Sequence, residues 1–365
     1  MPRDFKNLFA SLDIKNVHLR NRICMPPVVM FGLSDESAFA NNRHVEHYRR
    51  IAQGGVGLII QEASCVAADG KLSKNQLGIW DDKFIDPLRD IVDAVHAEGV
   101  PIFIQLHYAG LLGIQDINLS PSDFSASYRN RQVTGKEMSH SDMQRIDQAF
   151  VKSALRAKKI GYDGIEIHAA HGYLFSQFLN TRLNTRTDAY GLDPSLYLRE
   201  VFSHVKEAVG DTMVVGARFG CFEPRIQDGI KHAHELVKLG ADFLDVSRGC
   251  LDLVDNPTPQ DWPYSPLVYG AKLIKENLEA HNITTPVFTV DRITNPDMAE
   301  RIRKETHIDV IDIARGTLVN PCWANDAFAQ HEVGACLDCH ECCFRHDDPE
   351  HCPGRLRLSK LRAQA

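Results

Sequence analysis

Eight short runs of mostly apolar and β-branched residues alternate with amphipathic helical stretches between residues 20 and 320. Most of these runs lack the apolar–polar alternation of a strand that has one face in water, which is typical of parallel strands buried on both faces. Eight β-then-α units predict an α/β fold, a (β/α)8 barrel, with a doubly wound sheet as the alternative. The predicted strands are 22–27, 55–63, 100–106, 163–170, 213–219, 241–247, 286–290 and 309–314.

Local signals between the runs fit helices. Apolar residues fall on one helical face in the stretch 84–99. Several predicted helices end at a glycine, which tolerates the left-handed conformation of a helix end. These glycines are Gly54, Gly99, Gly161, Gly210 and Gly240. The polar, serine-rich segment 107–142 is too long for a plain barrel loop, so we expect a lid or a substrate-binding loop there.

Charge and hydropathy exclude two classes of partner. The chain has 365 residues, with 41 basic and 48 acidic side chains and a formal net charge of −7. This acidic balance argues against a nucleic-acid-binding surface. No apolar run approaches the roughly 20 residues that a membrane helix needs, and the first residues lack the apolar core of a signal peptide. The sequence predicts a cytoplasmic protein with no nucleic-acid and no membrane partner.

Polar side chains stand at the carboxyl ends of the predicted strands, where barrel enzymes hold their chemistry. Gln105 and Arg218 could hydrogen-bond the edge of a polar heterocycle. Two arginines near the last strands, Arg292 and Arg315, fit the usual phosphate site of a barrel.

These segments resemble the Old Yellow Enzyme family of FMN-dependent oxidoreductases over nearly the whole barrel. The matching segments include NRICMPP, VPIFIQLHYAG, ADFLDVSRG and IDIARGTLVNPCW, and the most specific is DGIEIHAAHGYLFSQFLNTRLNTRTDAYG. The resemblance implies FMN as cofactor and NAD(P)H as reductant. It implies flavin and ribityl contacts from Pro27, Ala63, Gln105 and Arg218, and phosphate contacts near Asp291, Arg292, Ala314 and Arg315.

The resemblance also implies catalytic roles for three residues. His168 and His171 match a pair that grips a substrate carbonyl, and Tyr173 matches a proton donor. Imidazole N–H groups would stabilise charge developing on an enone oxygen, and a phenol could protonate the α-carbon. Taken singly, the histidines could be core residues or zinc ligands, Tyr173 could be packing, and Arg315 could be a surface ion pair.

Some positions depart from the family pattern. Valine at 29 replaces a Thr or Cys that hydrogen-bonds the flavin in many members, and Asp291 and Ala314 each replace a glycine. A carboxylate 4 Å from a phosphate charge costs about 1 kcal/mol in water and more when shielded from water. Either the side chain of Asp291 points away, or Arg292 and Arg315 compensate for it.

Five of the ten cysteines crowd into the last part of the chain, which we expect to be a metal-binding tail (326–365) after an FMN-binding barrel (1–325). They are Cys336, Cys339, Cys342, Cys343 and Cys352. Four thiolates at such spacing suit a [4Fe–4S] cluster or a tetrahedral zinc. A similar run after the barrel, in the branch of the family that resembles 2,4-dienoyl-CoA reductase, favours iron–sulfur. Cys342 and Cys343 compete for one ligand position.

Three functions follow from these patterns. The first is an ene-reductase that reduces an activated C=C of an enone-type substrate with NAD(P)H. The second is an iron–sulfur flavoenzyme, of the dienoyl-CoA reductase or amine dehydrogenase type, fed by a separate reductase. The third is a barrel without cofactor that acts as a binding protein, since fold alone does not prove function. The physiological substrate and the oligomeric state, a homo-oligomer included, stay open.

Overall fold

Eight parallel strands close into a barrel in the computed structural model, which describes residues 5–128, 131–250, 254–345 and 349–364. Every predicted strand overlaps one of these eight, so the (β/α)8 barrel is confirmed and the doubly wound sheet is wrong. The strands are β3 (Ile23–Met25), β4 (Leu58–Cys65), β5 (Ile102–His107), β9 (Gly164–Ala169), β10 (Val214–Gly220), β11 (Leu244–Ser247), β12 (Val287–Thr289) and β13 (Val310–Asp312).

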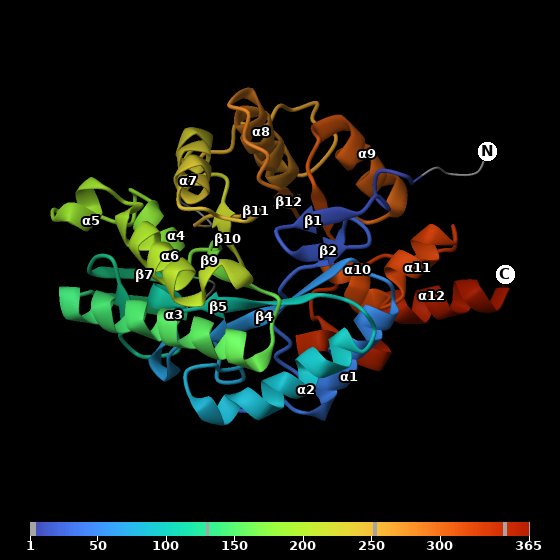
Figure 1. Ribbon diagram of the computed structural model, residues 1–365, viewed down its shortest axis with the longest axis horizontal. Helices are drawn as coiled ribbons and strands as arrows, with labels where there is room; N and C mark the ends of the chain where they lie inside the picture. The colour runs from blue at the N-terminus through green and yellow to red at the C-terminus, as the bar shows by residue number, and fades with distance from the viewer. Residues whose placement is uncertain (1–4, 129–130, 251–253, 346–348, 365) are drawn as a thin grey trace.

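Helices surround this barrel, as Figure 1 shows. The main ones are α1 (Asn42–Gln53), α2 (Ile85–His96), α3 (His140–Ile160), α6 (Leu196–Val209), α7 (Ile226–Lys238), α8 (Pro266–Ala280), α9 (Pro296–Thr306) and α10 (Ala314–Val319). Shorter helices are α4 (Leu174–Leu179) and α5 (Ala189–Leu192). Four of the five glycines expected at helix ends have positive φ. Gly54 does not (φ −71°), and Gly55 takes the left-handed conformation instead (φ +91°).

A hairpin that the sequence did not predict covers the amino-terminal end of the barrel. Strands β1 (Leu12–Ile14) and β2 (Val17–Leu19) pair antiparallel. Their apolar side chains pack against a layer inside the barrel that includes Phe103, Phe243 and Phe288, whose neighbouring rings lie 5.0–5.5 Å apart. This apolar layer closes one end of the barrel, which leaves the opposite end for a site.

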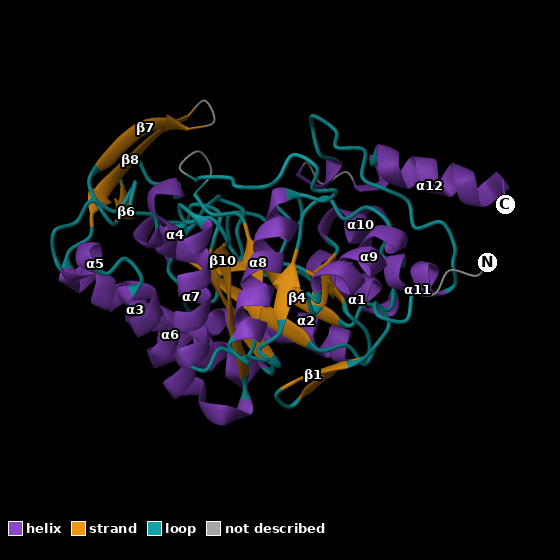
Figure 2. Cartoon of the chain, turned by 90° about the horizontal axis from the view of Figure 1, so that it is seen from above, coloured by secondary structure: helices purple, strands orange, loops and turns teal. Residues whose placement is uncertain are grey.

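The segment 107–142 forms a small sheet rather than an irregular loop. Strand β8 (Arg131–Glu137) pairs with β6 (Asn118–Ser120) and β7 (Phe124–Tyr128). Figure 2 shows this sheet at the opposite end of the molecule from β1. An apolar cluster that includes Leu111 and Val133 holds the segment in place. Its role as a lid stays a prediction.

The cysteine-rich tail begins within packed structure. The boundary expected at 325 falls inside α11 (Trp323–Phe328), where Trp323 is fully buried. The chain then runs past the cysteines to α12 (Pro353–Gln364), which lies on the same side of the molecule as β7 and β8 in Figure 2. No helix in the described ranges is long and apolar enough to span a membrane.

Candidate functional site

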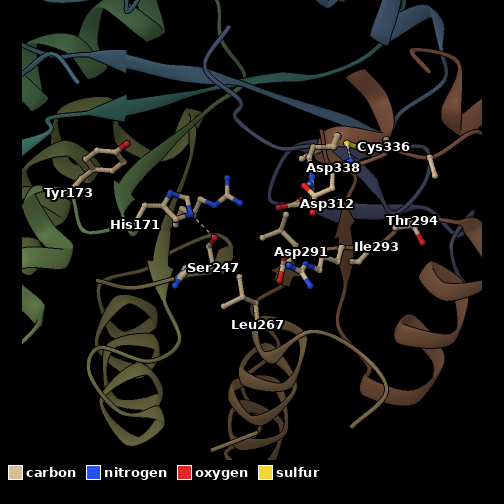
Figure 3. A pocket seen from close by; sticks show the side chains of 18 of the residues that line it. His171, Tyr173, Ser247, Leu267, Asp291, Ile293, Thr294, Asp312, Cys336 and Asp338 are labelled. Atoms are coloured by element: carbon tan, nitrogen blue, oxygen red, sulfur yellow. Dashed lines mark hydrogen bonds and ion pairs between the residues drawn. The ribbon is translucent and has the colours of Figure 1, made fainter. Parts of the chain in front are cut away.

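A cavity of about 810 Å³ opens at the carboxyl ends of the barrel strands. It is drawn in Figure 3, with Tyr173 and His171 at one side and Cys336 and Asp338 at the other. Seven of the residues predicted to act in catalysis or to bind FMN line it: His171, Tyr173, Arg218, Asp291, Arg292, Ala314 and Arg315. Its described lining does not include His168, Pro27, Ala63 or Gln105. Cys336 is the one cysteine of the tail among these lining residues.

Three histidines form a hydrogen-bonded chain beside the cavity. The Nδ1 atoms of His107 and His168 are 2.9 Å apart, and His168 Nε2 is 2.9 Å from His171 Nδ1. His171 Nε2 lies 2.8 Å from Ser247 Oγ. Both ring nitrogens of His168 are therefore engaged by other histidines, and only His171 reaches the cavity. Neither His107 nor Ser247 was singled out as a functional residue, although both stand at strand ends.

Burial keeps His107 and His168 neutral, the two histidines that do not reach the cavity. It lowers the pKa of His107 to about 3 and holds the pKa of His168 well below its usual range. A neutral imidazole has one donor and one acceptor, so the three contacts must all run in one direction. If they run outward, from His107 toward the cavity, His171 donates to Ser247 and His107 Nε2 bears a lone pair. If they run inward, His107 Nε2 is an N–H.

The surroundings of His107 choose between these directions. Its Nε2 atom is buried and has no hydrogen-bond partner among the described residues. Orphaned buried N–H groups are rarer than orphaned acceptors, so the outward direction is favoured. His171 Nε2 then carries a proton at the cavity wall.

The turn after β9 sets the positions of His171 and Tyr173. Both His171 (φ +62°) and Gly172 (φ +76°) take the left-handed conformation, which is strained for a histidine. The backbone N–H of His171 donates to the carbonyl of Arg248 at 2.7 Å, which holds the turn against the loop after β11. The Tyr173 ring packs edge-on against His107 and His168, with ring centroids 4.5 and 5.0 Å apart.

Opposite charges balance at the far end of the cavity. Asp291 (φ +101°) and Arg292 (φ +54°) follow β12 in the left-handed conformation that favours glycine. Arg315, at the start of α10, forms an ion pair with Asp338 of the tail. The surface ion pair considered for Arg315 is therefore observed, and two carboxylates accompany two guanidinium groups where a phosphate was predicted.

The cavity floor fits a polar heterocycle. Arg218 is 4% exposed, lines the cavity and has no hydrogen-bond partner for its Nε among the described residues. Gln105 lies deeper and donates from Nε2 to Glu166 Oε1 at 2.7 Å. Arg218 Nε lies 3.2 Å from Asp245 Oδ2, and the guanidinium also lines the cavity, where it could donate to the acceptor atoms of a flavin pyrimidine edge. The residues present are therefore compatible with FMN.

The tail cysteines are not gathered around one point. No three His, Cys, Asp or Glu side chains in the described ranges are placed to hold a metal ion. Cys342 and Cys352 instead pack against the apolar core, while Cys339 is exposed. The iron–sulfur cluster and the zinc site thus stay predictions.

A buried glutamate that the sequence did not reveal braces the loops behind His171. Glu223 accepts hydrogen bonds from Ser176 Oγ and Asn180 Nδ2, both at 2.6 Å, and from the backbone N–H of Cys250. Burial nevertheless raises the pKa of Glu223 to about 7. Its polar partners lie up to 47 residues away in the chain, so no local pattern announces them.

We expect Glu223→Gln to flatten the pH dependence of stability. The pKa of this acid is raised in the folded protein, so its stabilising effect is full below about pH 4.5 and lost as the pH rises through about 7. The wild type should lose up to about 3 kcal/mol from this group over that range, and the variant should not. Urea unfolding at pH 5 and pH 8 measures the difference, and parallel losses in both proteins would contradict it.

Comparisons with known proteins agree with the fold. Residues 7–332 match the model of the NADH:flavin oxidoreductase / NADH oxidase family. The chain is 35% identical over 323 residues to an NADPH dehydrogenase of Geobacillus sp. (strain WCH70), covering 87% of this chain and 92% of that protein. It is 34% identical over 363 residues to an NADH oxidase of Thermoanaerobacter brockii, covering 93% of this chain and 54% of that protein.

The solved structures give the same architecture. A 2-naphthoyl-CoA reductase in complex with 2-naphthoyl-CoA superimposes with a TM-score of 0.85 at 22% identity, covering 98% of this chain and 58% of that one. At this identity the match supports the fold alone. The chain spans about half the length of this structure and of the Thermoanaerobacter protein.

Proposed function

Because the chain belongs to the NADH:flavin oxidoreductase / NADH oxidase family, for which FMN and NAD(P)H are the expected cofactors, we propose that it reduces the activated C=C of α,β-unsaturated carbonyl compounds with NAD(P)H. The observation that carries the proposal is the single cavity that joins His171 and Tyr173 to Arg218 and Arg315. A carbonyl-binding group, an acid and a heterocycle-binding cation thus share one space.

Bound FMN would supply the hydride. Arg218 would contact the ring from the cavity wall that it lines. Arg292 and Arg315 would hold the phosphate, and Pro27, Ala63, Gln105 and Ala314 keep their predicted places around the cofactor. These roles are those that the family resemblance implies.

His171 would bind the substrate carbonyl from Nε2. In the outward direction of the histidine chain that nitrogen bears a proton, and Ser247 Oγ holds it until a substrate oxygen takes its place. His168 would act from behind by fixing the tautomer of His171. The phenol of Tyr173 would deliver the proton to the α-carbon.

Visible absorption spectra of the protein purified without oxygen test this function. We expect two flavin bands that bleach on addition of NADPH or NADH and return when a simple cyclic enone is added. A colourless protein that cannot be loaded with FMN would instead support the binding-protein alternative. Flavin bands that neither nucleotide bleaches would point to a flavoenzyme that needs a separate reductase.

A second candidate function is an iron–sulfur flavoenzyme fed by such a reductase. It is favoured by the position of Cys336, which lines the cavity itself, because a cluster there would lie close enough to exchange electrons with a bound flavin. The cysteine tail would have to rearrange to bring four thiolates together. Metal analysis of the anaerobically purified protein separates about four irons, one zinc or neither per chain, and size-exclusion chromatography tests a homo-oligomer.

We expect Asp338→Ala to tighten FMN binding about 1.4- to fivefold. The variant frees Arg315 for the phosphate and removes a carboxylate from the phosphate end of the cavity. Exposed ion pairs are worth about 0.2–1 kcal/mol, which sets this range. Fluorescence titration of the apoprotein with FMN measures it. Asp86→Ala, which breaks an exposed ion pair with Arg89 on α2, is the matched control, and equal affinities in both variants would contradict the expectation.

A further inference from the structure

Three carboxyl side chains and one arginine form a charged layer inside the barrel, between the phenylalanine layer and the cavity. Glu166, Asp245 and Asp312 are 0–1% exposed, and Arg218 is 4% exposed. The strand register brings them together, since Arg218 of β10 lies opposite Asp245 of β11. Asp312 ends β13 and lines the cavity.

Hydrogen-bond donors are scarce in this layer. Gln105 donates to one oxygen of Glu166. The second oxygen of Glu166 and both oxygens of Asp245 and Asp312 accept no N–H or O–H hydrogen bond from the described residues, and the thiol of Cys24 lies within hydrogen-bonding reach of Asp312. Arg218 Nε lies 3.2 Å from Asp245 Oδ2 but is not directed at it for a hydrogen bond.

The carboxyl groups instead face one another. Asp245 comes within hydrogen-bonding reach of both Glu166 and Asp312. Two buried carboxylates at that distance cannot both be ionised, so each contact requires a proton. If all three acids were ionised, the layer would bear two uncompensated negative charges beside Arg218, whereas two protons make it neutral.

We propose that Asp245 is the ionised partner of Arg218, and that Glu166 and Asp312 are neutral acids that donate their protons to it. This arrangement satisfies both acid–acid contacts and leaves one negative charge for one guanidinium. Asp312 lines the cavity, although both of its oxygens are buried, and we assign its carbonyl oxygen the role of a neutral hydrogen-bond acceptor there. A ligand seated over Arg218 would meet this oxygen with a hydroxyl or an N–H group.

The other groups around Asp312 agree with this assignment. The titratable and charged side chains that face the layer are Cys24 of β3, Glu166 and His168 of β9, Arg218 of β10 and Asp245 of β11. Burial raises the pKa values of Cys24, Glu166 and Asp312, and lowers the pKa of His168. Arg218 is thus the only cation in the set. The acids in the described ranges are not arranged as metal ligands either.

Isosteric amides test the assignment in the protein without cofactor. An amide reproduces a neutral acid, because its NH2 can donate to Asp245 and its carbonyl can accept. Glu166→Gln and Asp312→Asn should therefore change the unfolding equilibrium constant by less than about tenfold. Asp245→Asn should raise it by at least about a hundredfold, since it strands Arg218 in the interior. A tolerated Asp245→Asn beside a damaging Asp312→Asn or Glu166→Gln would overturn the proposal.

Infrared spectroscopy of the folded wild type counts the protonated carboxyl groups directly, so this test does not depend on whether a variant folds. At about pH 8.5 Glu62 and Glu223, with pKa values of about 7, are ionised and do not contribute. Two protonated carboxyl bands per chain are expected in the wild type and one in Asp312→Asn. No band at this pH in the folded wild type would refute the proton assignment.

The acceptor role of Asp312 rests on the function proposed above and is tested through FMN binding. Asp312→Asn should keep the FMN affinity within about threefold, whereas Asp312→Leu, which has no acceptor, should weaken it about tenfold. Lumiflavin, which lacks the ribityl chain, separates the two donors: an equal loss for lumiflavin indicates a ring N–H, and a loss for FMN alone indicates a ribityl hydroxyl. Equal affinity of the Asn and Leu variants would remove the acceptor role. A wild type that binds no FMN would contradict the proposed function. The unfolding equilibria and the infrared spectra, which need no cofactor, would still test the proton assignment.

Discussion

Replacing Arg218 with methionine is expected to abolish FMN retention and to lower the free energy of unfolding by about 3–5 kcal/mol. Methionine fills a similar volume, so the loss comes from charge rather than from a void. Without the guanidinium, the buried acids Glu166, Asp245 and Asp312 lose the one cation among them. Urea unfolding of the apoprotein and the flavin absorbance of the purified variant measure the two effects.

The double variant Arg218→Met/Asp245→Asn separates these effects. Removing both partners of a buried ion pair is far less costly than removing one, so the double variant should be more stable than Arg218→Met. It should still fail to hold FMN, because the donor to the ring is gone. A double variant that is less stable than both single variants would show that the two residues do not act as a pair.

The barrel could be predicted because its strands are buried on both faces and therefore differ from every other segment in composition. The hairpin β1–β2 could not, because its strands are three residues long and its turn, Lys15–Asn16, is not one of the glycine-containing pairs that mark tight hairpins. The sheet β6–β8–β7 was hidden for a related reason. Its polar strands gain their place from a few contacts, such as Leu111 and Val133, that join distant parts of the chain.

The sequence does contain a signal for the buried acids of the barrel interior. Glu166, Asp245 and Asp312 each interrupt an apolar run that reads as a buried strand: GIEIHA, FLDVS and VIDIA. A single acid in such a run must be paired, protonated or functional. The sequence does not show which acids meet, because β9, β11 and β13 lie far apart in the chain and meet only when the barrel closes.

The ion pair between Arg315 and Asp338 had no signal in the sequence. Arg315 was predicted to lie at the site near the last strand, and it lines the cavity, while its contact with a phosphate stays a prediction. Its partner Asp338 lies 23 residues later in the cysteine-rich tail, and no periodicity or motif links the two positions. Long-range ion pairs between exposed side chains depend on how a tail lies over the barrel, which local sequence does not determine.

Tyr173→Phe is expected to slow the reduction of an enone by about 10²- to 10⁴-fold, the usual contribution of a general acid, and to leave the reduction of the flavin by NAD(P)H within about twofold. Only the first of these half-reactions needs a proton from this position. The ring should stay in place, because it packs edge-on against the rings of His107 and His168. Stopped-flow absorbance measures each half-reaction separately.

The matched control is Tyr264→Phe, which removes a phenol hydroxyl that bonds Glu305 outside the cavity lining; neither half-reaction should change. A variant that loses both half-reactions equally would assign Tyr173 to the architecture of the cavity.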